Sequence, residues 1–119
     1  MQAITMNTDG IKTLIEFDKS NAYKLLSETV EGLIEAIDLP SLNVTMWVNE
    51  EYRYMGFDQN PTATSLFMNE YDVKDYISGN VVFTSMLTDS EGNTVGLDDN
   101  QVQTLTNYTK QSYLIKLGE

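Results

Sequence analysis

Apolar residues occur in this chain only as short runs, and turn-forming residues separate one run from the next. Val81-Val82-Phe83 is typical of the longest runs, so no segment is apolar for long enough to span a bilayer as a helix. Turn chemistry recurs at close intervals, for example at Asp9-Gly10, Pro40 and Gly79-Asn80. The sequence therefore predicts short strands and helices connected by tight turns.

Strand-like segments occur at the start of the chain and through its middle. Residues 2–17 predict a strand pair, because two apolar runs lie on either side of the hairpin-type turn Asn7–Gly10. Val44–Val48 is β-branched and aromatic, the composition of a half-buried strand. Strand character is also expected over residues 33–37, 52–55, 72–79 and 81–87, and the apolar tail Tyr113–Leu117 is expected to form a last strand or a docked end.

A first helix is expected over residues 19–31, where apolar residues recur at helical spacing. Asp18 or Ser20 would cap its free N–H groups. Gly32 would cost roughly 1 kcal/mol inside a helix, but it suits the left-handed residue that follows a helix end. The helix is therefore expected to stop at Gly32, and a strand is expected to follow.

Two further helices have clear start signals. Asn60-Pro61 combines a capping side chain with a proline at the first helical position, where the missing N–H is no loss. This helix is expected to run to about Met68. Asp98 is expected to open the last helix, since Gln101 stands three residues later in the spacing of a capping box.

The order of these elements indicates an α+β fold. Strands come first, then a helix, a meander, a second helix and more strands, which differs from the regular alternation of α/β folds. The 119 residues suit one domain, residues 1–119. We expect a mixed or mainly antiparallel sheet with two or three helices packed on it, most simply on one face.

The chain has no histidine and no cysteine. This excludes disulfides, zinc sites of the usual kind, and catalysis by Ser-His-Asp or Cys-His groups. The chain also lacks the glycine-rich phosphate-binding motifs and the nucleophile elbow Gly-x-Ser-x-Gly. We therefore expect a protein that is not an enzyme and that has no cofactor, no metal and no catalytic residue.

Charge is the strongest global signal, with 18 acidic against 7 basic residues and a formal net charge of −11. Nucleic acid and anionic membranes repel such a chain, so binding to either is not expected. A basic protein would attract it, although acidity also serves solubility alone. The start of the chain has no basic and apolar targeting pattern, which favours a cytoplasmic location.

Two asparagines stand out as candidate site residues. Asn49 is followed by Glu50 and Glu51 at an expected strand end, which suggests a polar binding site on a turn or an asparagine that shapes the turn. Asn60 is either an amide that recognises a ligand or the cap of a helix. Both alternatives remain open for each asparagine.

Aromatic residues gather in the central third of the chain. Trp47, Tyr52 and Tyr54 are candidates for a binding surface, although core packing explains the same residues. Nucleic-acid stacking would need interleaved basic residues, and Arg53 is the only arginine. The acidic residues near the C-terminal third, Asp89, Glu91, Asp98 and Asp99, lack the spacing of a calcium loop, so no metal site is expected.

Five segments follow, in order, the pattern of a known family. They are Val30–Glu35, Val48–Glu51, Met55–Phe57, Asn60–Thr64 and Ile77–Val82. Through them, about residues 20 to 107 resemble the domain of unknown function 3846 family, small uncharacterised proteins of phages and bacteria. The resemblance implies a shared fold and a phage or prophage source, and it also draws attention to Asn49 and Asn60. It implies no activity.

Three functions remain as hypotheses. The first is a phage-encoded acidic accessory protein that is not an enzyme and that binds a basic host protein in the host cytoplasm, in a sharper form as a DNA mimic. The second is a small-molecule or nucleotide-binding module that uses Asn49 and Asn60. The third is a structural homo-oligomer such as a homodimer, paired through sheet edges or the apolar tail.

Overall fold

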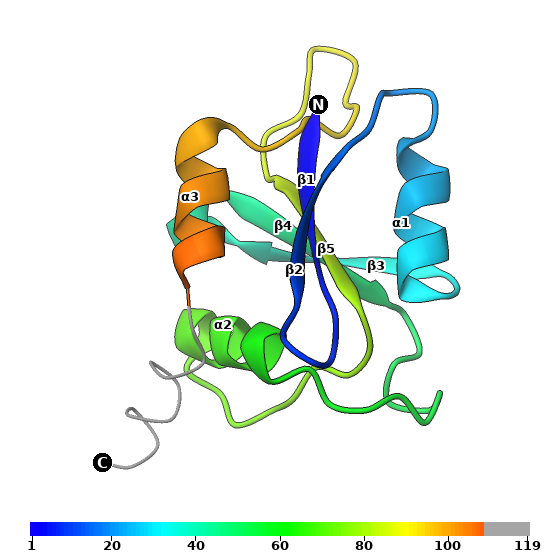
Figure 1. The fold of residues 1–119 in the computed structure, drawn as a ribbon, viewed down its shortest axis with the longest axis vertical. Helices are drawn as coiled ribbons and strands as arrows, with labels where there is room; N and C mark the ends of the chain where they lie inside the picture. Colours follow the sequence, from blue (N-terminus) through cyan, green and yellow to red (C-terminus); the bar gives the residue numbers. More distant parts are fainter. Residues whose placement is uncertain (109–119) are drawn as a thin grey trace.

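A five-stranded antiparallel sheet forms the centre of the molecule and carries α-helices on both faces (Figure 1). The structure, a computed structural model, describes residues 1–108. The strand order is β2-β1-β5-β4-β3. The strands are β1 (Gln2–Met6), β2 (Lys12–Glu16), β3 (Ile34–Leu39), β4 (Val44–Asn49) and β5 (Val81–Ser85), and the helices are α1 (Ala22–Val30), the 3-10 turn η1 (Pro40–Leu42), α2 (Pro61–Tyr71) and α3 (Asp99–Asn107). The α+β fold predicted from the sequence is confirmed.

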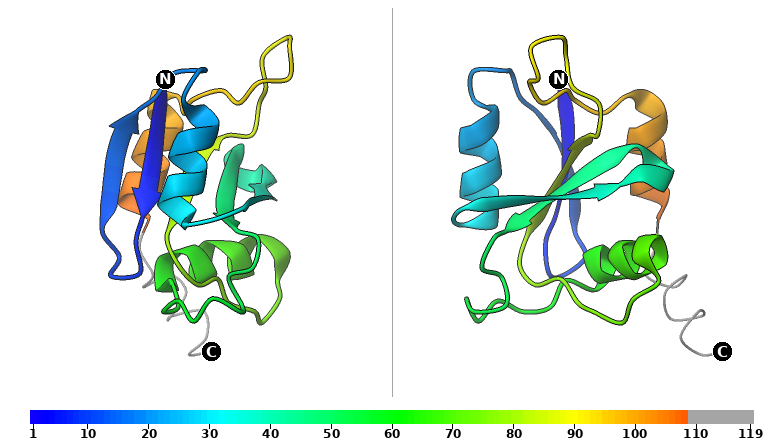
Figure 2. Two further views of the ribbon diagram at one scale, coloured as in Figure 1. Left: turned by 90° about the vertical axis from the view of Figure 1, so that its right-hand side faces the viewer. Right: turned by 180° about the vertical axis from the view of Figure 1, so that it is seen from behind.

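Each face of the sheet has its own apolar core. Ile4, Phe83 and Met46 are neighbours across three strands, and they pack under α2 and α3. On the opposite face, Ala3 and Val82 pack under α1. Figure 2 shows α1 separated from α2 and α3 by the strands.

The expectation that helices cover only one face is therefore wrong. The reason lies in β5, where all five residues are buried. A strand buried on both faces reads as a continuous apolar run, as in Val81-Val82-Phe83, and does not show the alternation of a strand with one wet face. A central strand of this kind requires cover on both sides.

The hairpin between β1 and β2 has the predicted turn. The side-chain oxygen of Asn7 accepts hydrogen bonds from the N–H groups of Asp9 and Ile11, at 3.0 and 2.9 Å. Gly10 has a φ of 83°, which only glycine adopts without strain. The strand pair expected over residues 2–17 is confirmed.

Helix α1 is shorter than expected at its start and ends one residue earlier. Asp18 accepts hydrogen bonds from the N–H groups of Ser20 and Asn21, so it shapes the turn before the helix instead of capping it. At the other end Glu31 takes the left-handed conformation, with a φ of 64°, in place of Gly32. The strand predicted after this helix is confirmed as β3.

The two other helices begin where the sequence predicts. Asn60 accepts a hydrogen bond from the N–H of Ala63 at the start of α2, which continues to Tyr71, beyond the expected end at Met68. At α3, the side chain of Asp98 accepts from the N–H of Gln101, whose side chain accepts from the N–H of Asp98, both at 2.8 Å. The capping box is therefore confirmed.

Two predicted strands are absent from the described residues. Residues 52–55 form consecutive turns after β4, and residues 72–79 form a loop whose only bridge pairs Ser78 with Gln59. Both loops direct single apolar side chains into the core, Tyr52 and Ile77, so their composition resembles that of strands without strand pairing. The expected tail element Tyr113–Leu117 lies outside the described residues.

No helix within residues 1–108 has both the length and the apolar character needed to cross a bilayer.

Candidate functional site

The predicted site residue Asn49 ends β4 with its side chain buried between two elements. Its Nδ2 atom donates to the carbonyl oxygens of Val30 at 3.0 Å and Glu31 at 3.3 Å, the last residues of α1 and its cap. Its Oδ1 atom accepts from the N–H of Glu51 at 2.8 Å. Both amide hydrogens and the oxygen of Asn49 are thus engaged with backbone, and the side chain joins the end of α1 to the turn after β4.

Gly32 allows this junction to form. A Cβ atom at Gly32 would lie 2.8 Å from Nδ2 of Asn49, closer than side-chain carbons approach nitrogen in folded proteins. The N–H of Glu50 donates to the carbonyl of Leu33 at 2.8 Å, which holds the chain after β4 against the start of β3. The glycine therefore serves a close approach of two chain segments, in addition to following a helix end.

Four exposed glutamates lie on the segments that meet at this junction: Glu31, Glu35, Glu50 and Glu51. We call them the glutamate cluster. Glu31 follows α1, Glu35 lies on β3, and Glu50 and Glu51 follow β4. Within residues 1–108, no hydrogen bond or ion pair engages any of their carboxylates. The cluster thus places uncompensated negative charge at the end of α1, whose last carbonyls carry partial negative charge of their own.

Arg53, the only arginine, lies just beyond the cluster but is held by another group. Its guanidinium hydrogen-bonds the carboxylate of Asp75 and lies 5.0 Å from the ring centre of Tyr52 and 5.4 Å from that of Tyr76. The bond to Asp75 raises the pKa of Arg53 and lowers the pKa of the Asp75 carboxyl. Arg53 therefore ties two loops together and leaves the glutamates of the cluster unpaired.

Tyr52 belongs to this loop contact and to the core. It is 8% exposed and meets Tyr76 edge to face, with ring centres 6.5 Å apart. Burial raises the pKa of the Tyr52 hydroxyl, the nearby charge of Arg53 opposes this, and the carboxylates of Asp75 and Glu35 add to the increase. Glu35 lies two residues before Ile37 on β3, so it is on the same side of the sheet as Ile37 and Tyr52, which pack in one core.

The three aromatic candidates do not form one surface. Trp47 faces α1, on the side of the sheet opposite to Tyr52, and its Nε1 donates to Thr84 at 2.9 Å. It lines an open hollow of about 250 Å³ beside Tyr23. Tyr54 is 85% exposed in the loop after β4. The three residues lie within eight positions of one another in the sequence, but the turn after β4 and the alternation of the strand send them in different directions.

Asn60 is fully buried and binds three backbone groups. Its oxygen caps α2 through the N–H of Ala63 at 3.1 Å, and its Nδ2 donates to the carbonyls of Met6 at 3.2 Å and Gly79 at 2.9 Å. It joins the start of α2, the end of β1 and the chain before β5. Like Asn49, it has no amide group left for a ligand, because both side chains bind backbone groups within residues 1–108.

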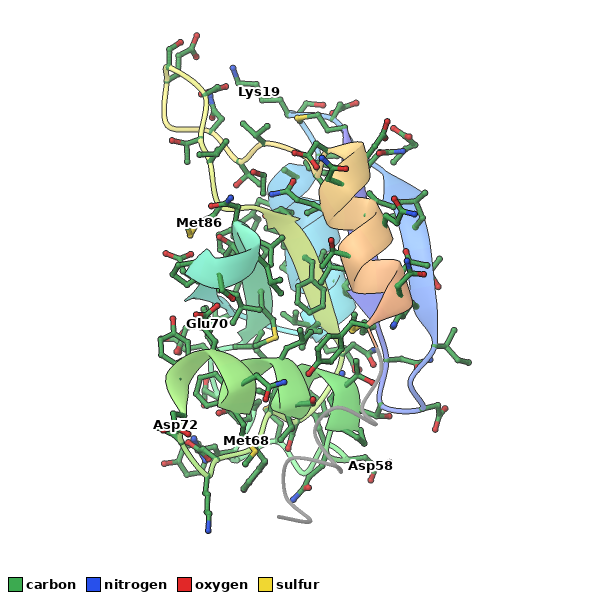
Figure 3. All side chains as sticks on the ribbon, turned by 90° about the vertical axis from the view of Figure 1, so that its left-hand side faces the viewer. Lys19, Asp58, Met68, Glu70, Asp72 and Met86 are labelled. Atoms are coloured by element: carbon green, nitrogen blue, oxygen red, sulfur yellow. The ribbon has the colours of Figure 1, made fainter. Side chains whose placement is uncertain are left out.

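The remaining acidic residues of interest have structural partners. Asp89 accepts from the N–H groups of Glu91 and Asn93, both at 2.9 Å, and these bonds lower the pKa of its carboxyl. Lys19, labelled in Figure 3 beside this loop, forms ion pairs with Asp89 and Glu91. Glu70, labelled at the end of α2, accepts hydrogen bonds from the N–H and the hydroxyl of Ser41 in η1. Within residues 1–108, no three acidic side chains are grouped to hold a metal ion.

Sequence reasoning missed the contact between Arg53 and Asp75. The two residues lie in loops 22 positions apart, and the sequence pattern predicted strands at both places. The available signal was that Arg53 is the only arginine in a chain with many carboxylates, which makes an ion pair at that position the expected outcome.

A family model described as Domain of unknown function (DUF3846) matches residues 1–111 of the 119-residue chain. No curated protein and no solved structure matches the chain.

Proposed function

Since the chain belongs to the DUF3846 family, whose description assigns no activity, we propose its function from its surface: it binds a basic partner protein through the glutamate cluster, without catalysis. In this proposal it is a phage- or prophage-encoded accessory protein, and its partner is a protein of the host cytoplasm. The family resemblance supports the source, and the charge of the chain supports the chemistry of the partner.

The observation that carries this proposal is that none of the four carboxylates has a hydrogen bond or an ion pair within residues 1–108. Most other acidic side chains within residues 1–108 form turns, caps or ion pairs, as Asp18, Asp89 and Asp98 do. Those without such a contact, for example Asp9, Asp72 and Asp99, lie on separate elements. The glutamates of the cluster have no such contact, although Asn49 and Gly32 hold the backbone beneath them in a defined shape. An exposed, uncompensated group of like charges on a rigid base favours association with the opposite charge.

A partner with a lysine- or arginine-rich surface is attracted by the negative electrostatic potential of the glutamate cluster. Such contacts act mainly on the association rate and on the choice of partner, and salt screens them over about 8 Å at physiological ionic strength. The DNA-mimic form of the proposal further requires that the carboxylates occupy a groove that normally binds phosphates. The basic partner is the common element of both forms.

The test compares two variants of equal charge. Glu35, Glu50 and Glu51 are changed to glutamine in the cluster variant, and Asp9, Asp72 and Asp99 are changed to asparagine in the control variant. Both triple variants lose the same charge, so a general effect of acidity alters both alike. Each is immobilised and exposed to lysate of a bacterial host at low salt, and retained proteins are identified and then measured as purified proteins.

We expect the unaltered chain and the control variant to retain the same basic protein, and the cluster variant to bind it at least tenfold more weakly. Equal weakening of both variants would reduce the proposal to general electrostatic attraction and contradict a specific site. Retention of no basic protein at low salt by the unaltered chain would also reject it.

A further inference from the structure

Strand β2 is an edge of the sheet whose outer side has no partner in the described chain. Met1 and Phe17 exchange both backbone hydrogen bonds, at 2.9 and 2.8 Å, and the N–H of Asn7 donates to Ile11 at 3.0 Å. Such bonds alternate along an antiparallel pair. The backbone N–H and C=O groups of Thr13 and Ile15 therefore point towards β1, and those of the even-numbered residues of β2 point outward. Figure 2 shows these strands along one side of the molecule.

The opposite edge, β3, is protected. The N–H of Glu50 donates to Leu33, so the same alternation directs the backbone groups of Asp38 outward. The hydroxyl of Tyr71 donates to the carbonyl of Asp38 and occupies that position. Glu35 and Asp38 are the charged residues of this strand, and both are acidic, so a second copy of β3 would meet like charge. These are common means of preventing edge-to-edge pairing.

Strand β2 lacks these protections, and apolar side chains are exposed on it and beside it. Leu14, at the middle of the strand, is 52% exposed, and Ile11, just before it, is 58% exposed. The strand contains no proline, and its two charged residues, Lys12 and Glu16, have opposite signs. Such an edge can template pairing with another strand.

We propose that two copies of the chain associate through β2, as an antiparallel pair around a two-fold axis at Leu14. In this register Leu14 lies opposite its own copy, and Lys12 of each copy lies opposite Glu16 of the other. Each of these outward residues then exchanges both of its backbone hydrogen bonds with its counterpart. All five residues of the strand are paired, and the sheet continues from one copy into the next.

Other registers are less favourable. Moving the axis to Thr13 or Ile15 keeps the hydrogen-bond pattern, but it leaves one end of each strand unpaired. It also places Leu14 opposite Lys12 or Glu16, so the exposed leucines no longer meet. Complete pairing and the contact between the two Leu14 side chains therefore select the register, and the exposed charge pairs add only about 0 to 1 kcal/mol each.

Both charged groups also have partners within their own copy. Lys12 donates through Nζ to the carbonyls of Thr106 and Tyr108 at the end of α3, and Glu16 lies 3.5 Å from the N-terminal amino group. The net charge of −11 on each copy opposes association over long range, and added salt screens this repulsion. We therefore expect a weak dimer that becomes stronger as salt rises from low to physiological concentration.

The first experiment measures the mass of the full chain by analytical ultracentrifugation over a wide concentration range. Leu14→Lys places two ammonium groups against each other at the axis, and Leu87→Lys is the control, because Leu87 is 64% exposed in the loop after β5. We expect the unaltered chain and Leu87→Lys to approach twice the monomer mass, and Leu14→Lys to remain monomeric with an unchanged circular dichroism spectrum. A monomer at every concentration, or dimerisation of Leu14→Lys, overturns the proposal.

The second experiment tests the register and uses the absence of cysteine from the chain. Opposite residues in a hydrogen-bonded antiparallel pair have Cα atoms about 5.5 Å apart, within the range of a disulfide. Leu14→Cys should therefore cross-link under mild oxidation at least tenfold faster than Thr13→Cys, which lies off the axis. Equal rates overturn the register. If the chain dimerises only after residues 109–119 are removed, the proposal for the full chain is overturned. That result would mean that these residues block β2 of their own copy in the full chain.

Discussion

The amide nitrogen of Asn49 lies 3.0 Å from the carbonyl oxygen of Val30, and this contact joins the end of β4 to the end of α1. The last carbonyls of a helix have no partner within the helix, so a buried end requires one from elsewhere. Asn49 supplies it from a strand, and its oxygen simultaneously fixes the turn that begins at Glu50. One buried side chain therefore determines where the glutamate cluster lies.

Replacing Asn49 with alanine should lower the free energy of unfolding by about 2 kcal/mol, because buried backbone groups at both elements lose their partners. Chemical denaturation measures this loss. Asn100→Ala, at an exposed position in α3, is the control and should change stability by less than about 0.5 kcal/mol. A loss at Asn49 no larger than that at Asn100 would contradict the role of Asn49 as a junction.

Gly32→Ala tests the close approach at the same junction. A methyl group 2.8 Å from Nδ2 of Asn49 must displace the amide, so we expect a loss of about 1 to 3 kcal/mol. In an Asn49→Ala background the amide is absent, and the further cost of Gly32→Ala should be smaller. A double-mutant cycle measures this coupling. Additive effects of the two substitutions would show that the clash is not the cause.

Asn60→Asp separates two roles of the same side chain. Aspartate caps helices as well as asparagine does, so a residue that served only as a cap would tolerate the change. Asn60 also donates to the carbonyls of Met6 and Gly79, and a carboxylate there would face two oxygens without a proton to share. We expect a loss of about 3 kcal/mol at neutral pH, where the carboxylate is charged and buried. If Asn60→Asp had the same free energy of unfolding as the unaltered chain, capping would be the only role of Asn60.

The sequence predicts those parts of the fold that depend on residues close together in the chain. The hairpin turn at Asn7–Gly10, the cap at Asn60 and the box of Asp98 with Gln101 each involve residues within four positions. Their geometry follows from local backbone chemistry. The element order was enough to predict an α+β fold.

The junction itself could not be derived in this way. Asn49 was a candidate from its position at a strand end, but its partners lie 18 and 19 residues earlier. Nothing in the local pattern distinguishes a ligand amide from an amide that binds a distant helix end. The loop containing Tyr52 was predicted as a strand because a single buried aromatic side chain has the same composition in a loop as in a strand.

The contact between Arg53 and Asp75 should make stability depend on pH in the acid range. The hydrogen bond from Arg53 lowers the pKa of the Asp75 carboxyl, and a hydrogen bond from the N–H of Tyr76 lowers it further. A carboxyl whose pKa is lower in the folded state contributes stability above its unfolded value of about 3.9. That contribution is lost as the pH falls through the lower pKa of the folded state.

Asp75→Asn should therefore melt at a lower temperature than the unaltered chain at neutral pH, and the difference should shrink as the pH falls below about 3.9 and through the lower pKa of the folded state. High salt should reduce the difference at neutral pH, because both side chains are partly exposed, at 41% and 35%. Thermal unfolding followed by circular dichroism measures each midpoint, and Asp9→Asn in the hairpin turn is the matched control. A difference between Asp75→Asn and the unaltered chain that stays constant across this pH range would show that lost packing, and not the charge of Asp75, causes the effect.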